Sequence, residues 1–357
     1  MVVCLHAQIM IPGFHKIFPS VVGRSGVDIF FAISGFVMVY VTSSRLRSPK
    51  EFILARIIRI VPVYWFYTFG VMLLMVVAPT LYRTNELSVR HLVLSLLFIP
   101  HHTAVVPNSI LPMVKVGWTL IYEMSFYLVF ALAMVVSFRR RIAVTAAVLA
   151  TVVAISALAG PFSAQALLDD SSVAFYLHFY GYQIVLEFVL GMLIAAYYLH
   201  GKLPRLNIWI GVAIVLLASA VMLATSQGGD ADVVESSNRF FCFGIPAAAI
   251  VLTVLLLENS GYIGKSNTFL LIGDASYSIY LVHMLPLALL RWAWPHLHMP
   301  ETGVFWGIVF ILVSFVVVVP CGIASYLYIE RPAMRYLRRL TGVGRRIPVA
   351  DKTPAAS

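Results

Sequence analysis

Long apolar stretches, separated by short polar and basic segments, make up most of this chain. Stretches long enough for a helix to cross a bilayer occur at residues 27–43, 60–79, 117–138, 142–160, 176–198, 207–225, 240–257, 270–291 and 304–328. The apolar residues 1–12 are too short to cross and count as part of a helix. The pattern therefore predicts an all-α fold, a polytopic membrane helix bundle of about ten transmembrane helices with the first one truncated.

The basic residues cluster between these stretches. They lie within residues 45–59, 139–141, 202–205, 265 and 331–346, as expected for cytoplasmic loops under the positive-inside rule. Residues 13–26, 80–116, 161–175, 226–239 and 292–303 are then outside, and both termini are cytoplasmic if the first stretch belongs to a complete helix. This scheme requires that residues 92–107, which contain two prolines, do not cross fully. Residues 1–338 form one integral membrane domain, and residues 339–357 a basic cytoplasmic tail that we expect to be disordered.

Composition narrows the class of protein further. With 61% hydrophobic and 11% charged residues, the composition of the chain lies outside the range of soluble globular proteins. We therefore expect the chain to be embedded in a lipid bilayer. The net charge of +10 suggests nucleic acid, but its position in loops argues against a nucleic-acid partner. The pairs His101–His102 and His296/His298 have no carboxylate or cysteine at ligand spacing, so we predict no metal site.

A carboxylate, Glu123, lies inside one of the predicted membrane helices. An ionisable side chain at that depth is expensive to insert and is expected to face other protein and to have a function. The structural alternative is that Thr119 or Tyr127, at i−4 and i+4, simply satisfies it. Glu187 is a second buried carboxylate, for which the sequence suggests no partner.

Other ionisable side chains lie at a depth similar to that of Glu123. At 1.5 Å per residue, Glu123 and His6 lie roughly 9 Å below the outer ends of their helices, and His283 roughly 13 Å. Asp28 lies at the outer mouth of its own helix. We expect His6 and Glu123 to form a general base and its orienting carboxylate; for His283, substrate contact and packing are equally open.

Two arginines mark the opposite layer of the membrane. Arg56 and Arg59 lie one turn apart on the same helix face, just before Pro62. Their guanidinium groups are suited to binding phosphate, but basic residues at this side of a membrane need no ligand to explain them. Both interpretations stay open.

Several short motifs follow one another along the chain. They are His6 after an apolar run, residues 26–36, Arg56-Ile-Ile-Arg59 with Pro62 to Trp65, Trp118-Thr-Leu-Ile-Tyr-Glu123 with Phe126-Tyr127, Ser276-Tyr-Ser-Ile-Tyr280-Leu-Val-His283, and Glu330-Arg-Pro332. In this order the motifs resemble the membrane acyltransferases of acyltransferase family 3, which include exopolysaccharide and lipopolysaccharide O-acetyltransferases. The best fit is to the branch of exopolysaccharide production proteins.

The resemblance implies transfer of an acyl group, usually acetyl, from a cytoplasmic acyl-CoA (acetyl-CoA) to a sugar hydroxyl of a glycan or lipid-linked oligosaccharide at the outer face of the bacterial inner membrane. No permanently bound cofactor is implied. The catalytic pair maps onto His6 and Glu123, and donor binding onto Arg56 and Arg59. The expected contacts to the substrates, including a donor to the oxyanion, are Asp28, Trp118, Tyr280 and His283.

One departure from the family concerns the first helix. Only five residues precede His6, whereas family members carry a longer helix with an arginine upstream, so we expect poor insertion or low activity. The alternatives to an enzyme are a transporter or flippase, which also uses intramembrane ionisable groups, and a purely structural subunit. The absence of repeated halves argues against a transporter, and a structural subunit leaves the clustered ionisable groups unexplained.

Overall fold

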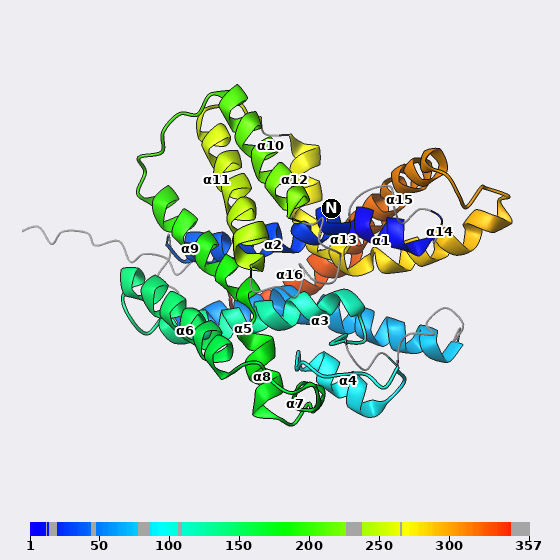
Figure 1. The fold of residues 1–357 in the computed structure, drawn as a ribbon, viewed down its shortest axis with the longest axis horizontal. Coiled ribbons are helices and arrows are strands. Elements are labelled where there is room, and N and C mark those ends of the chain that lie inside the picture. The colour runs from blue at the N-terminus through cyan, green and yellow to red at the C-terminus, as the bar shows by residue number, and fades with distance from the viewer. Residues whose placement is uncertain are drawn as a thin grey trace, which may run out of the picture.

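The computed structural model describes residues 1–11, 13, 20–43, 48–77, 86–105, 109–225, 238–264 and 266–343. Within these ranges every regular element is helical (Figure 1), which confirms the predicted all-α class. The α-helices are α1 (Val2–Met10), α2 (Ser20–Ser43), α3 (Pro49–Val77), α4 (Val89–Leu96), α5 (Trp118–Ala133), α6 (Phe138–Ala159), α7 (Ala164–Leu168), α8 (Val173–Tyr180), α9 (Leu186–Leu199), α10 (Ile208–Ala224), α11 (Ile245–Asn259), α12 (Asn267–Asp274), α13 (Ser276–Val282), α14 (Met284–His296), α15 (Val304–Ser325) and α16 (Arg331–Thr341). Short 3₁₀ segments are η3 (Lys115–Gly117) and η4 (Gln183–Val185), and π-helical segments are η5 (Phe240–Gly244) and η6 (Tyr326–Glu330).

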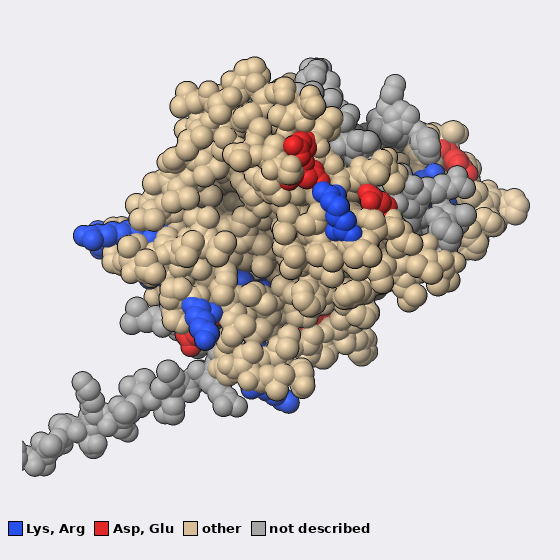
Figure 2. All heavy atoms as spheres, turned by 90° about the horizontal axis from the view of Figure 1, so that it is seen from below, with Lys and Arg blue, Asp and Glu red and all other residues tan. Residues whose placement is uncertain are grey.

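The described part of the chain contains six helices long and apolar enough to cross a membrane. A seventh span results if α8 and the continuous η4–α9 segment, bent by 43° at their junction, are taken together. Many apolar side chains point outward, such as Leu158 and Trp209 at 86% and 76% exposure, and Figure 2 shows few charged side chains on the face it presents. Outward apolar surface of this extent is typical of helices that face lipid.

The predicted count of ten spans is not confirmed. The stretch 270–291 is divided among α12, α13 and α14, each shorter than a span, and α10 has 17 residues. Helix α1, with nine residues, is about 14 Å long, against a hydrocarbon core of about 30 Å. Of the described residues 92–105, only those at the end of α4 are helical; α4 has eight residues and is too short to cross.

The boundary of the predicted tail falls within a helix. Residues 339–341 belong to α16, and residues 344–357 lie outside the described residues.

Helices α2 and α9 cross at very close range. A Cβ added to Gly191 would lie 1.9 Å from the carbonyl oxygen of Ala32, and one added to Gly35 would lie 2.1 Å from that of Phe188. Small residues permit this approach, as is common where membrane helices pack. The contact fixes the position of α2, which carries Asp28 and Ser34.

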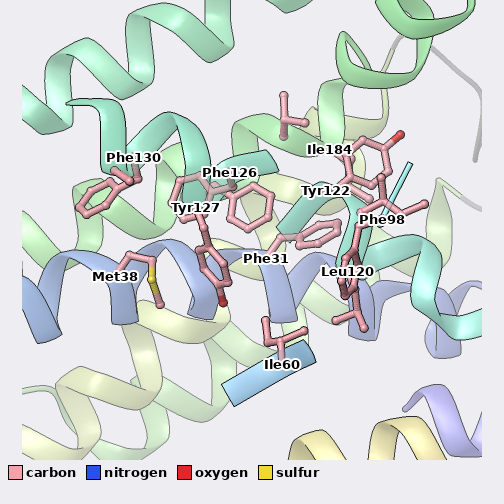
Figure 3. Close-up of a cluster of buried hydrophobic side chains, with 14 of the residues drawn as sticks. Phe31, Met38, Ile60, Phe98, Leu120, Tyr122, Phe126, Tyr127, Phe130 and Ile184 are labelled. Carbon is pink, nitrogen blue, oxygen red and sulfur yellow. The ribbon is translucent and has the colours of Figure 1, made fainter. Parts of the chain in front are cut away.

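Aromatic side chains fill the core between α2, α3, α5 and α9. Phe126 of α5 stacks on Phe188 with ring centroids 4.2 Å apart, and Phe31 of α2 packs on the same ring at 4.7 Å. In Figure 3, Tyr127 extends from α5 toward α2, with Ile60 of α3 nearby. The core thus holds the helix bearing Glu123 against the helices that bear Ser34 and the two arginines.

Hydrogen bonds fix the ends of several elements. Ser48 and Glu51 form a capping box at the start of α3: the Glu51 N–H donates to Ser48 Oγ (3.2 Å) and the Ser48 N–H to Glu51 Oε2 (3.3 Å).

Asp170 accepts hydrogen bonds from Arg90 and from the backbone and side chain of His102. These contacts place the predicted outer segments 80–116 and 161–175 on the same side of the bundle.

Candidate active site

A cavity of about 840 Å³ lies between α1, α3, α13, α14 and the segment that leads into α5. Its volume is within the range of small-molecule binding sites. His6 of α1 lines it, together with Lys115 of η3 and with Arg291 and His296 of α14, and the rest of its wall is mostly apolar. One predicted catalytic residue therefore lies at the wall of a large cavity.

His6 forms a pair with His283. The Nδ1 atom of His6 lies 2.8 Å from Nε2 of His283, and the two rings are stacked with centroids 4.9 Å apart. His283 is fully buried and is not part of the cavity wall. The sequence predicts Glu123 as the partner of His6; the structure places a second histidine there instead.

The hydrogen bonds of His283 define which nitrogen of His6 carries a proton. His283 Nδ1 lies 2.6 Å from the carbonyl oxygen of Tyr280, and because a carbonyl only accepts, Nδ1 must be the donor. A buried imidazole without a carboxylate partner is expected to be neutral, so its Nε2 accepts from the His6 Nδ1–H. In neutral His6 the lone pair is then on Nε2, the nitrogen a general base would use.

Tyr280 supports the histidine pair from the turn before His283. Its hydroxyl donates to the carbonyl oxygen of Val116 (2.8 Å) and lies 2.9 Å from the hydroxyl of Thr119. The ring centroid of Tyr280 is 5.9 Å from that of His283. Because the only hydroxyl hydrogen of Tyr280 is engaged with Val116, this residue is not a ready donor to an oxyanion in this arrangement.

Trp118, the other predicted oxyanion donor, opens α5 directly after η3. Its ring packs edge-on against Tyr122, with centroids 6.1 Å apart. Neither Trp118 nor Tyr280 belongs to the cavity wall.

Glu123 belongs to a different polar cluster. Its carboxylate is buried and accepts hydrogen bonds from the hydroxyl of Tyr127 and, at 3.3 Å, from that of Ser34. The Tyr127 contact is the one that the i+4 spacing suggests. Arg56 and Arg59 both interact electrostatically with Glu123, so the predicted separation of an acidic outer layer from a basic inner layer is wrong for this residue.

Arg56 is held by aromatic rings as well as by charge. Its guanidinium carbon lies 5.7 Å from the ring centroid of Phe52 and 5.8 Å from that of Tyr127, within the range of cation–π attraction. Arg59 interacts with Glu123 and also with Glu330, whose carboxylate accepts from the Ser278 hydroxyl at 2.6 Å. Motifs from four distant parts of the sequence thus converge around the two arginines.

Asp28 lies in a third cluster, away from the cavity wall. It is fully buried and accepts from the guanidinium of Arg239 at 2.9 Å. Glu187 is buried beside it and interacts with it electrostatically, and neither oxygen of the Glu187 carboxyl group has a hydrogen-bond partner among the described residues. One arginine neutralises one carboxylate, so we expect the second carboxyl group to hold a proton, because an unpaired buried charge would be very costly.

Comparisons with known proteins show the class of protein to which the chain belongs. A family model described as an acyltransferase domain matches residues 1–324. The chain belongs to this acyltransferase family. Among curated proteins, the acyltransferase is similar to "Exopolysaccharide production protein ExoZ" of Rhizobium meliloti (strain 1021), with 34% identity over 321 residues, 88% of this chain and 90% of that protein. It is also similar to "Acyltransferase MdmB" of Streptomyces mycarofaciens, with 25% identity over 279 residues, 74% and 68% of the two chains. No solved structure matches.

These findings establish a multi-pass membrane acyltransferase and confirm the resemblance seen in the motifs. The basic residues at these clusters that the sequence analysis does not single out are Lys115 and Arg291 at the cavity wall and Arg239 beside Asp28. Arg239 had a signal: two buried carboxylates, Asp28 and Glu187, require a cation nearby. Lys115 and Arg291 had no such signal in the sequence, because basic residues near helix ends are common.

Proposed function

We propose that this acyltransferase moves an acetyl group from acetyl-CoA to a sugar hydroxyl of an exopolysaccharide, a lipopolysaccharide or a lipid-linked glycan precursor. The enzyme would act in the bacterial inner membrane with both termini in the cytoplasm. The observation that carries the proposal is the histidine pair, which directs the lone pair of His6 to Nε2 at the wall of a large cavity. The similarity to ExoZ, which is named an exopolysaccharide production protein, supports a glycan acceptor.

In the proposed reaction His6 is the general base. Its Nε2 takes the proton of the sugar hydroxyl while the oxygen attacks the thioester carbonyl. The tetrahedral oxyanion then collapses, the carbon–sulfur bond breaks, and the imidazolium of His6 returns the proton to the departing thiolate. Neither predicted donor to the oxyanion lines the cavity, and the hydroxyl hydrogen of Tyr280 is engaged with Val116, so the proposal assigns no oxyanion donor.

Arg56 and Arg59 are proposed to bind the phosphates of acetyl-CoA. Guanidinium groups bind phosphate in a bidentate manner, and Glu123 is close enough to both arginines to position them. Replacing Arg56 or Arg59 by Gln should therefore raise the KM for acetyl-CoA, whereas Arg140→Gln, at an exposed arginine in the first turn of α6, should not. An unchanged donor dependence would return the two arginines to a purely topogenic role.

The test of the function is the acetyl content of the surface polysaccharide. A strain lacking the gene is complemented with the wild type or with His6→Gln, and the polysaccharide is examined by mass spectrometry before and after mild base. The wild type should restore a base-labile acetyl mass and the variant should not, at equal amounts of protein in the membrane. The matched control is His296→Gln, because His296 lines the same cavity but its Nδ1 donates to the carbonyl oxygen of Trp292.

Two outcomes would contradict the proposal. Full acetylation with His6→Gln would remove His6 from the chemistry. An identical glycan mass in the deletion and complemented strains would remove the glycan as acceptor.

A further inference from the structure

Two basic side chains share the cavity wall with His6. Lys115 comes from η3 and lies close enough to His6 to interact with it electrostatically. Arg291 comes from α14, far along the chain from Lys115. The ion pairs found among the described residues do not include Arg291. Two separate parts of the chain thus each contribute a cation to the wall of the cavity that the proposed base also lines.

These cations are distinct from the arginines assigned to acetyl-CoA. Helix α3 lines the cavity with residues from Phe66 to Leu74, in its second half, while Arg56 and Arg59 lie in its first half and do not belong to the wall. From Arg56 to Gly70 the helix rises about 21 Å. The protein therefore has two basic regions at different levels, and one donor molecule needs only one of them for its phosphates.

We infer that Lys115 and Arg291 form a subsite for an anionic group on the acceptor, next to the hydroxyl that His6 deprotonates. This inference rests on the function proposed above. The anion is a phosphate of a lipid carrier or a carboxylate of an acidic sugar, both of which charge-assisted hydrogen bonds from Lys and Arg would hold. Cations beside largely apolar walls raise the local concentration of anions and repel cationic competitors. Apolar side chains such as Ile9 and Leu285 complete the wall and suit a lipid tail or the apolar face of a sugar ring.

The test uses the purified full-length protein with acetyl-CoA and three synthetic acceptors. The first is a disaccharide on a short lipid phosphate, and the second is the same disaccharide on a neutral lipid. The third is a disaccharide on the neutral lipid whose terminal sugar is a uronic acid. For Lys115→Gln and Arg291→Gln we expect the KM for the preferred anionic acceptor to rise by about tenfold or more. The KM for acetyl-CoA and for the neutral acceptor should stay unchanged. Arg291→Lys should recover part of the loss, and Arg335→Gln, an exposed arginine of α16, is the control.

The phosphate and the uronic acid acceptors distinguish the two sources of the anion. An equal rise in KM for all three acceptors, or a rise in the KM for acetyl-CoA instead, would overturn the subsite. Binding of the lipid phosphate without acetyl-CoA, measured by calorimetry, separates the subsite from the reaction. If the wild type binds this probe and both Gln variants do not, the subsite stands even where no acetyl transfer is found. If the wild type and the two variants bind the probe equally, the subsite is refuted.

Discussion

Replacing His283 by asparagine or glutamine separates the two hydrogen bonds of its imidazole. In His283→Asn the amide nitrogen takes the place of Nδ1, which lies 2.6 Å from the carbonyl oxygen of Tyr280 in the wild type. It can still donate to that oxygen, but no atom at position 283 then accepts from the His6 Nδ1–H. In His283→Gln the amide oxygen takes the place of Nε2, which lies 2.8 Å from His6 Nδ1 in the wild type. This oxygen can accept from the His6 Nδ1–H. If the pair sets the tautomer of His6, the two variants must differ in activity.

The expected magnitude follows from the cost of losing an orienting partner. That cost is about 10–100-fold for histidines that bind metals and about 10⁴-fold where a carboxylate orients a catalytic histidine. A neutral imidazole is a weaker partner than a carboxylate, so we expect His283→Asn to lower kcat by about 100-fold, or about 2.7 kcal/mol. His283→Gln should retain most of the activity.

The assay is the rate of acetyl transfer, normalised to folded protein measured by gel filtration in detergent. A double-mutant cycle with His6→Gln completes it. Once the base is gone its orientation no longer matters, so adding His283→Asn should cost almost nothing more in rate. Equal losses for Asn and Gln at position 283, or fully additive losses in the double mutant, would refute the assignment of His283 as a positioning residue.

Three further predictions concern stability, each measured as the thermal midpoint in detergent. Gly191→Ala places a Cβ 1.9 Å from the carbonyl oxygen of Ala32 and should cost about 1–3 kcal/mol, while Gly273→Ala, with nothing within 4 Å, should not destabilise; equal midpoints would contradict the close α2–α9 contact. Arg239→Gln leaves Asp28 charged and unpaired and should cost about 3–5 kcal/mol, whereas Glu187→Gln, which mimics a protonated carboxyl, should be tolerated; the reverse order would show that Glu187 is the ionised group. Burial and the neighbouring His101 lower the pKa of His91 from 6.5 to about 4, so the unfolded chain binds the proton first, and stability should be full above pH 6.5 and fall as the pH drops toward 4; His91→Gln should flatten that fall, and an unchanged slope would mean that a group other than His91 causes it.

The sequence alone predicts the class of fold, but not which of the important side chains meet. The rise per residue predicts one similar depth for His6, His283 and Glu123; the structure pairs the two histidines but places Glu123 with the two arginines. It does not give the rotation of each helix about its axis, since every residue turns the helix by about 100°. For this reason the pairing of the two histidines, 277 positions apart, does not follow from the sequence, and the predicted pairing of His6 with Glu123 is wrong.

Local contacts are easier to predict than distant ones. The bond from Tyr127 to Glu123 follows from the i+4 spacing, but the bond from Ser34, 89 positions away, depends on the close packing of α2 in the bundle. The number of spans is harder to predict for a related reason. Apolar composition marks residues 270–291 as one crossing, yet the structure divides them at Ala275 and His283, and mean hydropathy does not register such breaks.

The division at His283 has a functional consequence, because the short helix α13 connects the two polar clusters. Tyr277 donates to the carbonyl oxygen of Ile60 (2.8 Å), next to Arg59, and Ser278 to Glu330 (2.6 Å). One turn later Tyr280 contacts the start of α5, and His283 follows as the residue that orients His6. The same seven-residue helix thus sets the positions of both the arginine cluster and the histidine pair. Under the proposed function, α13 fixes the distance between the donor phosphates and the base.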